Sequence, residues 1–279
     1  MNPPQDSPTT VSLDLGSLGI DLLCNDLSLA QQLARRYRRF PPVALRRFRA
    51  FIQIEPGGVS NSLIQLPLRF QDGALVYDAP GFQGYVDSSA GHASLTLRCL
   101  QPEVQLDYYL RTICALLAFE AGGALFHAAA ILHGGQAYAF FGHSGSGKST
   151  VAGLSAPDVV LNDDLVLLMP GGDGWQVHAT PFWNQFRGQE PAPPARLAGL
   201  FRLVQDRQVF LEQIDTAHAV AEMIASLPVV SADRSRGVQL IQRCQAILER
   251  VPAYRLHFLP DASFWPLVEG AAGARIEPG

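Results

Sequence analysis

The segment from Gly142 to Ser149 constrains the fold of this chain more than any other part of the sequence. It reads GHSGSGKS and matches the pattern G-x-x-x-x-G-K-[ST] at every fixed position. The apolar segment AYAFF precedes it, so the pattern lies between an expected strand and the start of an expected helix. Glycines let backbone N–H groups turn inward around an anion, and the helix N-terminus adds positive partial charge. The segment therefore predicts an α/β domain with a phosphate-binding loop.

Lys148 is the one lysine among the 21 basic residues of the chain. A compact ammonium fits where a planar guanidinium cannot, which gives this exception a physical reason. We expect Lys148 to reach the β- and γ-phosphates of a nucleotide, and the Ser149 hydroxyl to bind Mg²⁺. The expected nucleotide-binding residues are Gly142, His143, Ser144, Gly145, Ser146, Gly147, Lys148, Ser149 and Thr150.

Two adjacent acids, Asp163 and Asp164, follow the apolar segment VVL and Asn162. A carboxylate at a strand end is the usual partner of a phosphate loop, because Mg²⁺ prefers hard oxygen ligands. Lys148 and Asp163 lie 15 positions apart, which leaves room for only a short helix and a turn. Side chains alternate along an extended chain, so one acid can face a metal ion while the other faces an incoming hydroxyl. The residues themselves leave open which acid has which role.

The sequences FFGHSGSGKST and VVLNDDLVLL together resemble the kinase core of HPr kinase/phosphorylase and, more distantly, that of phosphoenolpyruvate carboxykinase. Both families carry a phosphate loop and an Asp-Asp pair at this close spacing. Upstream, LFHAAAIL resembles the His-bearing strand of the family, and ATPFW, LFRLVQ and YRLHFLPDASFWPLVE resemble segments of HPr-kinase-related kinases. The resemblance covers about Leu125 to Glu269 and implies a compact P-loop kinase core of this type.

This resemblance implies an ATP- and Mg²⁺-dependent kinase that transfers the γ-phosphate to a hydroxyl, first of all the serine of a small protein or peptide. No RGMG-like loop follows the Asp-Asp pair, so the phosphorylase activity, and HPr itself as the substrate, are not expected. The roles of the two aspartates stay exchangeable. The residues that the resemblance implies are Asp163 as the base, His127 as the hydrogen-bonded partner of the base, Lys148 as a catalytic phosphate ligand, and Ser149 with Asp164 as metal ligands.

The chain is expected to form two parts. Short apolar runs separated by turns, among them GALVYDA and ASLTLRCL, alternate as half-buried strands do and predict a β-rich N-terminal module over 1–100, a candidate for substrate docking. The P-loop kinase domain is expected over 101–279. At its start, a broad apolar face predicts a helix over Glu103 to Glu120, and HGG between two apolar runs predicts a β-hairpin. The expected fold class is α/β.

Composition excludes several classes of function. The formal net charge of −4 disfavours nucleic-acid binding, and no apolar run approaches the roughly 18 residues that a membrane span needs. The polar start MNPPQDSPTT does not resemble a signal peptide, and the four cysteines form no CxxC pair. We therefore expect a cytoplasmic protein with reduced thiols, which could form a homo-oligomer.

Some residues have two interpretations. Seven arginines between residues 35 and 49 form either an irregular solvated segment or a docking patch for an acidic partner. Phe182 and Trp183 belong either to a groove or to the core, whereas Phe264 and Trp265 are expected to pack. Arg187, Arg196 and Arg202 follow the central strands, and one of them could neutralise the transferring phosphate.

Two other functions remain open from the sequence. The same site could phosphorylate the hydroxyl of a small molecule, such as free serine. Alternatively, the chain could be a regulatory module that binds ATP without transferring phosphate. His127 and the Asp-Asp pair favour a kinase, because a sensor does not need a base.

Overall fold

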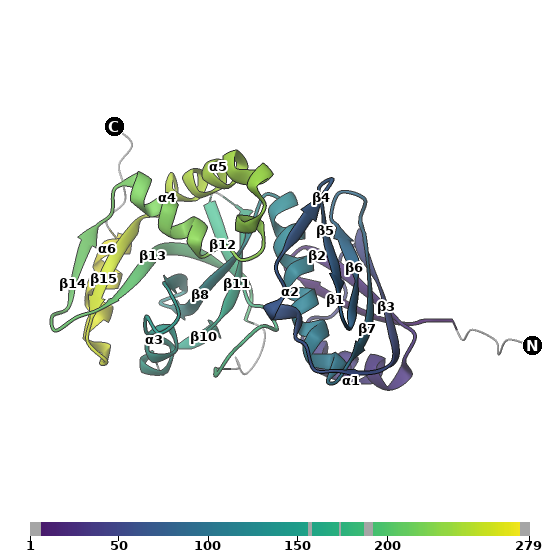
Figure 1. Ribbon diagram of the computed structural model, residues 1–279. Helices are drawn as coiled ribbons and strands as arrows, with labels where there is room; N and C mark the ends of the chain where they lie inside the picture. Colours follow the sequence, from purple (N-terminus) through teal and green to yellow (C-terminus); the bar gives the residue numbers. More distant parts are fainter. Residues whose placement is uncertain (1–6, 156–157, 173, 187–191, 274–279) are drawn as a thin grey trace, which may run out of the picture. The chain divides into compact units, whose positions relative to one another are not determined.

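The computed structural model describes residues 7–155, 158–172, 174–186 and 192–273 (Figure 1). Contacts between Cα atoms divide the chain into two compact units, residues 1–120 and 121–279. The sequence predicts the boundary at residue 100, before helix α2 (Pro102–Glu120). In the structure the boundary lies after this helix, at Glu120. Helix α2 therefore groups with the N-terminal unit.

The N-terminal unit is built on a seven-stranded sheet with the order β1-β2-β3-β7-β6-β5-β4. Strand β3 pairs in parallel with β2 and β7, and the other neighbours run antiparallel. Buried and more exposed side chains alternate along β5 and β7, as expected for a sheet covered on one face. Its elements are β1 (Thr9–Leu15), β2 (Leu18–Cys24), α1 (Leu27–Tyr37), β3 (Arg47–Val59), η1 (Leu63–Gln65), β4 (Arg69–Gln71), β5 (Ala74–Ala79), β6 (Phe82–Asp87), β7 (His92–Cys99) and α2.

Side-chain hydrogen bonds fix the helices of this unit. The Asp26 carboxylate caps α1 by accepting the Leu29 backbone N–H at 2.7 Å. In α2, the Tyr109 hydroxyl lies 2.7 Å from the Tyr85 carbonyl and 2.8 Å from the Ser94 carbonyl, which ties the helix to β6 and β7. The predicted helix and the two predicted strands are confirmed as α2, β5 and β7.

Part of the arginine-rich segment has a structural role. The Arg47 guanidinium forms ion pairs with Asp14 at 2.7 Å and Asp21 at 2.5 Å, and all three side chains are largely buried. The Arg36 guanidinium pairs with Asp107 of α2 at 2.8 Å. The segment is also less irregular than expected, because it begins in α1 and ends in β3. These two arginines therefore serve the packing of the N-terminal unit.

The C-terminal unit contains an eight-stranded sheet with the order β10-β8-β11-β12-β13-β15-β14, in which β9 pairs with β8 and β13. Helices α4 and α5 pack against each other. Its elements are β8 (Ala124–His133), β9 (Gln136–Phe141), α3 (Lys148–Leu154), β10 (Val159–Asn162), β11 (Leu165–Gly171), β12 (Gly174–His178), β13 (Ala195–Gln205), β14 (Phe210–Gln213), α4 (Thr216–Ala225), η2 (Val230–Ala232), η3 (Arg234–Arg236), α5 (Gly237–Leu248), β15 (Ala253–Phe258), η4 (Ala262–Phe264) and α6 (Trp265–Gly273).

Strand β9 carries the phosphate loop at its carboxyl end. It pairs antiparallel with β8, which confirms the predicted hairpin, and parallel with β13. The aromatic rings of Phe140 and Phe201 stack at 5.5 Å, and Phe264 and Trp265 pack on the same cluster, as predicted. The loop therefore follows a strand that is anchored in an aromatic cluster of the core.

The mixed α/β class expected from the sequence is confirmed. All four cysteines are free thiols, as expected. Among the described residues, no helix has both the length and the apolar character needed to cross a membrane.

Candidate active site

The loop between β9 and α3 has a backbone that requires glycine at two of the motif's fixed positions. Gly142 has φ of +151° and Gly147 has φ of +107°, values that residues with a Cβ rarely adopt. A Cβ on Gly147 would also lie 2.5 Å from the Phe258 ring, and one on Gly142 would lie 2.8 Å from the Ser146 Oγ. The pattern read from the sequence thus corresponds to a tight turn that brings backbone N–H groups together.

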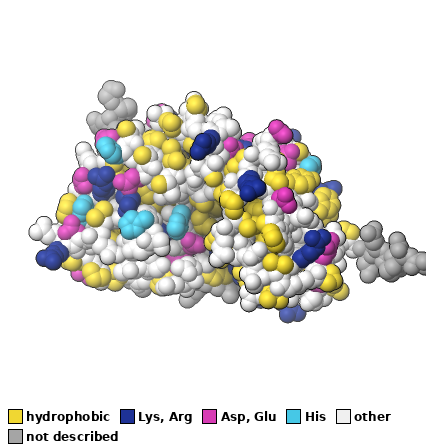
Figure 2. Space-filling view, in the orientation of Figure 1, with side chains coloured by type: hydrophobic (Ala, Val, Ile, Leu, Met, Phe, Trp, Pro, Cys, Tyr) yellow, Lys and Arg dark blue, Asp and Glu magenta, His cyan; other side chains and the backbone are white. Residues whose placement is uncertain are grey.

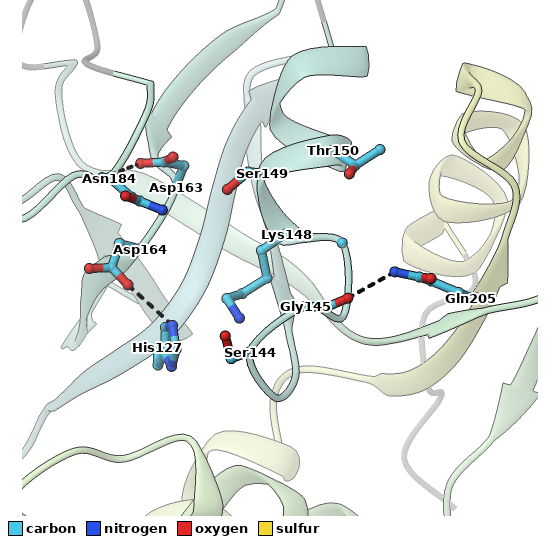
Figure 3. Close-up of a pocket in the computed structure, with 11 residues that line it drawn as sticks. His127, Ser144, Gly145, Lys148, Ser149, Thr150, Asp163, Asp164, Asn184 and Gln205 are labelled. Atoms are coloured by element: carbon cyan, nitrogen blue, oxygen red, sulfur yellow. Dashed lines mark hydrogen bonds and ion pairs between the residues drawn. The ribbon is translucent and has the colours of Figure 1, made fainter.

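The Lys148 side chain lies over this loop (Figure 3), and the residue is 8% exposed. It donates hydrogen bonds to the carbonyls of Gly142, at 2.9 Å, and His143, at 3.2 Å. Burial lowers the pKa of this ammonium; the Asp164 carboxylate opposes the shift and the Arg202 guanidinium adds to it. Lys148 is therefore a buried cation whose present partners are neutral carbonyls, and an anion in the loop would be a stronger partner.

Two further side chains help to define the loop. The Ser146 Oγ is buried and has no hydrogen-bond partner among the described residues. The Gln205 side-chain amide donates to the Gly145 carbonyl at 2.8 Å and holds the loop from strand β13. A buried hydroxyl without a protein partner is one that a water molecule or a phosphate oxygen would satisfy.

Asn162 shapes the turn that carries the two aspartates. Its side-chain oxygen accepts the backbone N–H groups of Asp164, at 2.8 Å, and Leu165, at 3.1 Å. Its amide nitrogen donates to the Thr180 carbonyl at 3.0 Å. This asparagine lets the chain leave β10 and enter β11 while the two adjacent carboxylates diverge.

The Asp163 carboxylate is almost fully buried, with 2% of the residue exposed. It accepts three backbone N–H groups, from Asn184 and Gln185 at 2.8 Å each and from Phe186 at 3.2 Å. Asp163 therefore holds the segment after β12 in place, and most of its hydrogen-bonding capacity is already used.

His127 lies beside Asp164, with its Nε2 atom 3.1 Å from the Asp164 Oδ1 atom (Figure 3). The pair forms because β8 and β11 are antiparallel neighbours in which His127 lies opposite Leu165. The sequence-based expectation placed His127 beside Asp163 instead. The structure differs because side chains alternate at the strand end, so Asp163 turns toward Asn184 while Asp164 faces β8.

Most of the expected residues line one cavity of about 470 Å³. Gly142 and His143 line an adjoining cavity, and Ser146 lines neither. Sequence reasoning missed Asn184 and Gln205. Gln205 ends β13, and its place beside the loop depends on the parallel pairing of β13 with β9, which the sequence does not contain. The lining residues are His127, Ser144, Gly145, Gly147, Lys148, Ser149, Thr150, Asp163, Asp164, Asn184 and Gln205.

The side chains of this cavity supply some of the oxygen donors that a metal ion needs. In the part of the chain that the structure describes, no group of three or more His, Cys, Asp or Glu side chains could hold a metal. Mg²⁺ commonly takes one or two protein oxygens and completes its shell with phosphates and water. The Ser149 hydroxyl and the two aspartates supply such hard oxygens in the same cavity, so the donor set fits Mg²⁺ bound together with a nucleotide.

The structure places two of the three arginines that were candidates for neutralising the transferring phosphate. Arg202 lines the adjoining cavity beside Gly142, whereas Arg196 is exposed on β13. Arg187 lies outside the described residues. Phe182 is fully buried and belongs to the core, and the neighbouring Trp183 is half-buried.

No family model matches the chain. A segment of 78 residues is 35% identical to "Methyl-coenzyme M reductase II subunit beta" of Methanothermobacter marburgensis. The match covers 28% of this chain and 18% of that subunit, which is too little of either to show a family.

Proposed function

We propose that this chain is an ATP- and Mg²⁺-dependent kinase with a P-loop kinase core of HPr-kinase type. It transfers the γ-phosphate to a hydroxyl, first of all the serine of a small protein or peptide. One observation carries the proposal: a single cavity contains the phosphate-loop lysine, the Ser149 hydroxyl and the His127–Asp164 pair. Phosphoryl transfer needs these three functions in one place, namely a phosphate cradle, a metal ligand and a base.

The phosphate loop would bind and orient the triphosphate. The Lys148 ammonium would exchange its two carbonyl partners for phosphate oxygens, and the inward N–H groups of the loop would hold the rest. Mg²⁺, when bound, would neutralise the charge of the β- and γ-phosphate oxygens. The Ser149 hydroxyl and the Asp163 carboxylate would hold this ion. Asp163 keeps one acceptor site for it, because three of its four are used by backbone N–H groups.

The geometry favours Asp164 as the base. It is the more accessible acid, and the adjacent His127 fixes the direction of its carboxylate. Asp164 would accept the proton of the attacking hydroxyl at a carboxylate oxygen. This exchanges the roles that the family resemblance implies for the two aspartates, and the exchange rests on the His127 contact and on the burial of Asp163.

The proposal is tested by following ADP formation from Mg-ATP, together with the intact mass of candidate serine-containing acceptors. Lys148→Ala should abolish transfer, because the triphosphate loses its cation.

Asp164→Asn should keep ATP binding but lose about 10²- to 10⁴-fold in turnover, the usual contribution of a general base. Phosphate transfer by Asp164→Asn at the parental rate would contradict the assignment of the base. ATP binding without ADP formation under any condition would instead favour the sensor function.

A small-molecule acceptor is the second candidate for the same site. It is favoured by the size of the adjoining cavity, about 330 Å³, which lies at the lower end of the range for small-molecule sites.

A further inference from the structure

The loop between α1 and β3, residues 38–46, exposes two aliphatic side chains. Leu45 is fully exposed and Val43 is 78% exposed. The loop is nevertheless tied to the sheet, because the Asp14 carboxylate of β1 accepts the backbone N–H groups of Val43, at 2.7 Å, and of Ala44. Apolar side chains that a fixed loop exposes are already ordered, so a partner that covers them loses little conformational entropy.

Unpaired arginines lie at both ends of this α1–β3 loop. Between residues 27 and 54 the chain contains seven arginines and no acidic residue. Two of the seven, Arg36 and Arg47, pair with acids of the N-terminal unit. Basic side chains also lie beside hydrophobic ones on the face of this unit that Figure 2 shows. The arginines that are exposed and form no ion pair with any described residue are Arg35, Arg38, Arg46 and Arg49.

The positions of these arginines favour an acidic partner. Arg38 follows α1 directly and Arg46 precedes β3, so the two exposed aliphatic side chains lie between them in the chain. A guanidinium group matches a carboxylate because its planar N–H groups can bind two oxygens. A partner that carries both carboxylates and aliphatic side chains would therefore satisfy the whole loop.

Strand β1, beside this loop, is an edge of the N-terminal sheet. The Phe40 carbonyl accepts the Asp14 backbone N–H at 3.1 Å, so the backbone groups of Asp14 point away from β2. Alternate residues of an antiparallel strand share this direction, which applies to Thr10 and Ser12. Their backbone N–H groups have no hydrogen-bond partner among the described residues. The edge is thus closed at Asp14 and open before it, and an open edge can take up a further strand.

These features favour an extended peptide over an anionic bilayer. A peptide can use the open edge, the aliphatic side chains and the arginines together, because its backbone supplies the hydrogen bonds that β1 lacks. A lipid surface offers no strand to this edge. The formal net charge of −4 also opposes the approach of the whole chain to an anionic membrane.

We propose that the α1–β3 loop and the open edge of β1 dock an extended acidic segment of the phosphate acceptor. Carboxylates of this segment pair with Arg38 and Arg46. Its aliphatic side chains cover Val43 and Leu45, and its backbone adds to β1. The inference rests on the proposed function, because it assigns the segment to the acceptor. The acceptor is then a peptide or small protein with an acidic stretch separate from the serine that is phosphorylated.

Binding to the full chain is measured without nucleotide, by the fluorescence anisotropy of the labelled peptide Asp-Glu-Leu-Glu-Val-Asp-Glu. The control peptide, Asn-Gln-Leu-Gln-Val-Asn-Gln, has the same length and aliphatic side chains but no carboxylate side chains. We expect a Kd about 10-fold lower for the acidic peptide, because several exposed ion pairs form. Equal affinity for the two peptides, or no binding of either, overturns the inference.

Neutralising the loop tests where the acidic peptide binds. The double variant Arg38→Gln/Arg46→Gln should raise its Kd about 5- to 30-fold, the range for two exposed ion pairs. Arg69→Gln/Arg234→Gln is the matched control, since it removes the same net charge from two exposed arginines on β4 and η3. If both double variants bind the peptide equally well, the attraction comes from net charge and the inference is overturned.

The aliphatic contact has its own test. Leu45→Ser should raise the Kd of the acidic peptide about 10-fold, because part of a leucine side chain is no longer covered on binding. Val238→Ser is the control, as Val238 lies on α5 and is 65% exposed. Both positions are on the surface, so both variants should fold. An unchanged Kd for Leu45→Ser would contradict the proposed docking.

Kinetics test whether the segment belongs to the acceptor. The peptide Gly-Ala-Ser-Gly-Ala is joined to the acidic or the neutral segment by a glycine-rich linker of about 20 residues, which spans about 25 Å on average. With Mg-ATP, we expect the acidic version to have a KM about 5- to 30-fold lower at a similar kcat, because docking adds binding energy away from the reacting atoms. Arg38→Gln/Arg46→Gln should remove this difference. Equal KM values overturn the assignment to the acceptor.

The outcomes separate this inference from the proposed function. If serine acceptors are phosphorylated but the acidic peptide does not bind, the docking surface is contradicted and the kinase function stands. If the peptide binds through the loop and no acceptor is phosphorylated, the proposed function fails and so does the assignment of the segment to an acceptor. If vesicles of phosphatidylserine and phosphatidylcholine bind the chain, lose it with Leu45→Ser, and the peptide does not bind, the loop binds membranes and the inference is overturned.

Discussion

Asp163 and Asp164 are neighbours in the chain, but their carboxylates have different surroundings. Asp163 is buried against three backbone N–H groups, and Asp164 lies beside His127 at the cavity wall. The sequence identifies both acids and His127 as site residues, because each belongs to a recognisable local pattern. It does not show their pairing, because that depends on the register of β8 against β11 and on the return of the chain near Asn184.

Asp163→Asn should destabilise the protein by about 1–3 kcal/mol, because an amide places N–H donors against backbone N–H donors and leaves buried groups unpaired. The free energy of unfolding from urea titration measures this loss. Asp164→Asn is the control and should unfold close to the parental midpoint, since Asp164 is partly exposed. Equal stability of the two variants would show that the hydrogen bonds to residues 184–186 contribute little.

At the scale of elements, prediction succeeds where the pattern is long or the turn chemistry is distinctive. Helix α2 and the β8–β9 hairpin were expected on these grounds. From Val11 to Leu33 the sequence is mostly apolar with scattered polar residues, and this pattern predicts no particular element. This region forms β1, β2 and the start of α1, joined by a turn in which Gly16 has φ of +61°. The position of Gln205 also depended on a strand order that the sequence does not contain.

His133 joins strand β8 to helix α6 and to Asp158, the residue before β10. At the end of β8, its Nδ1 atom lies 2.7 Å from Asp158 and its Nε2 atom 2.5 Å from Glu269 of α6, and its ring stacks on Trp265 at 4.4 Å. The hydrogen bond to Asp158, together with Glu269, raises the pKa of His133 above its ordinary value of 6.5. The imidazolium therefore stabilises the fold fully below the unfolded pKa, and this contribution is lost as the pH rises through the folded value.

His133→Gln should reveal this dependence. The difference in Tm between the parental protein and the variant should be largest near pH 6 and should shrink as the pH rises toward 9. Thermal melts at matched ionic strength measure it, and His218→Gln, which removes an exposed histidine, is the control. A difference in Tm that is constant with pH would mean that His133 acts by packing alone.

All the described residues that line the nucleotide cavity or the adjoining cavity belong to residues 121–279. The two-part organisation was expected because short alternating apolar runs separated by turns precede the segment that carries the phosphate loop. The sequence does not predict the observed boundary between the two units, because the apolar face of α2 could pack against either unit. The sheet of the N-terminal unit has its own buried core, including Leu13, Ile20 and Leu95.

The fragment 121–279 should therefore bind Mg-ATP with a Kd within a few-fold of that of the full chain. Isothermal titration with the purified fragment measures this, and the same fragment carrying Lys148→Ala is the control. A folded fragment, verified by circular dichroism, that does not bind ATP would show that the N-terminal unit is needed for the nucleotide site.

The solitary lysine has a practical consequence. An amine-selective acylating reagent can meet only one side-chain amine in this protein, and burial has made that amine less basic than usual. The fraction of Lys148 acylated, read by peptide mass mapping, therefore reports on occupancy of the loop without any substituted residue. A nucleotide bound in the loop would lower the acylated fraction of Lys148, and this fraction plotted against nucleotide concentration gives the binding curve. The assay does not depend on knowing the phosphate acceptor.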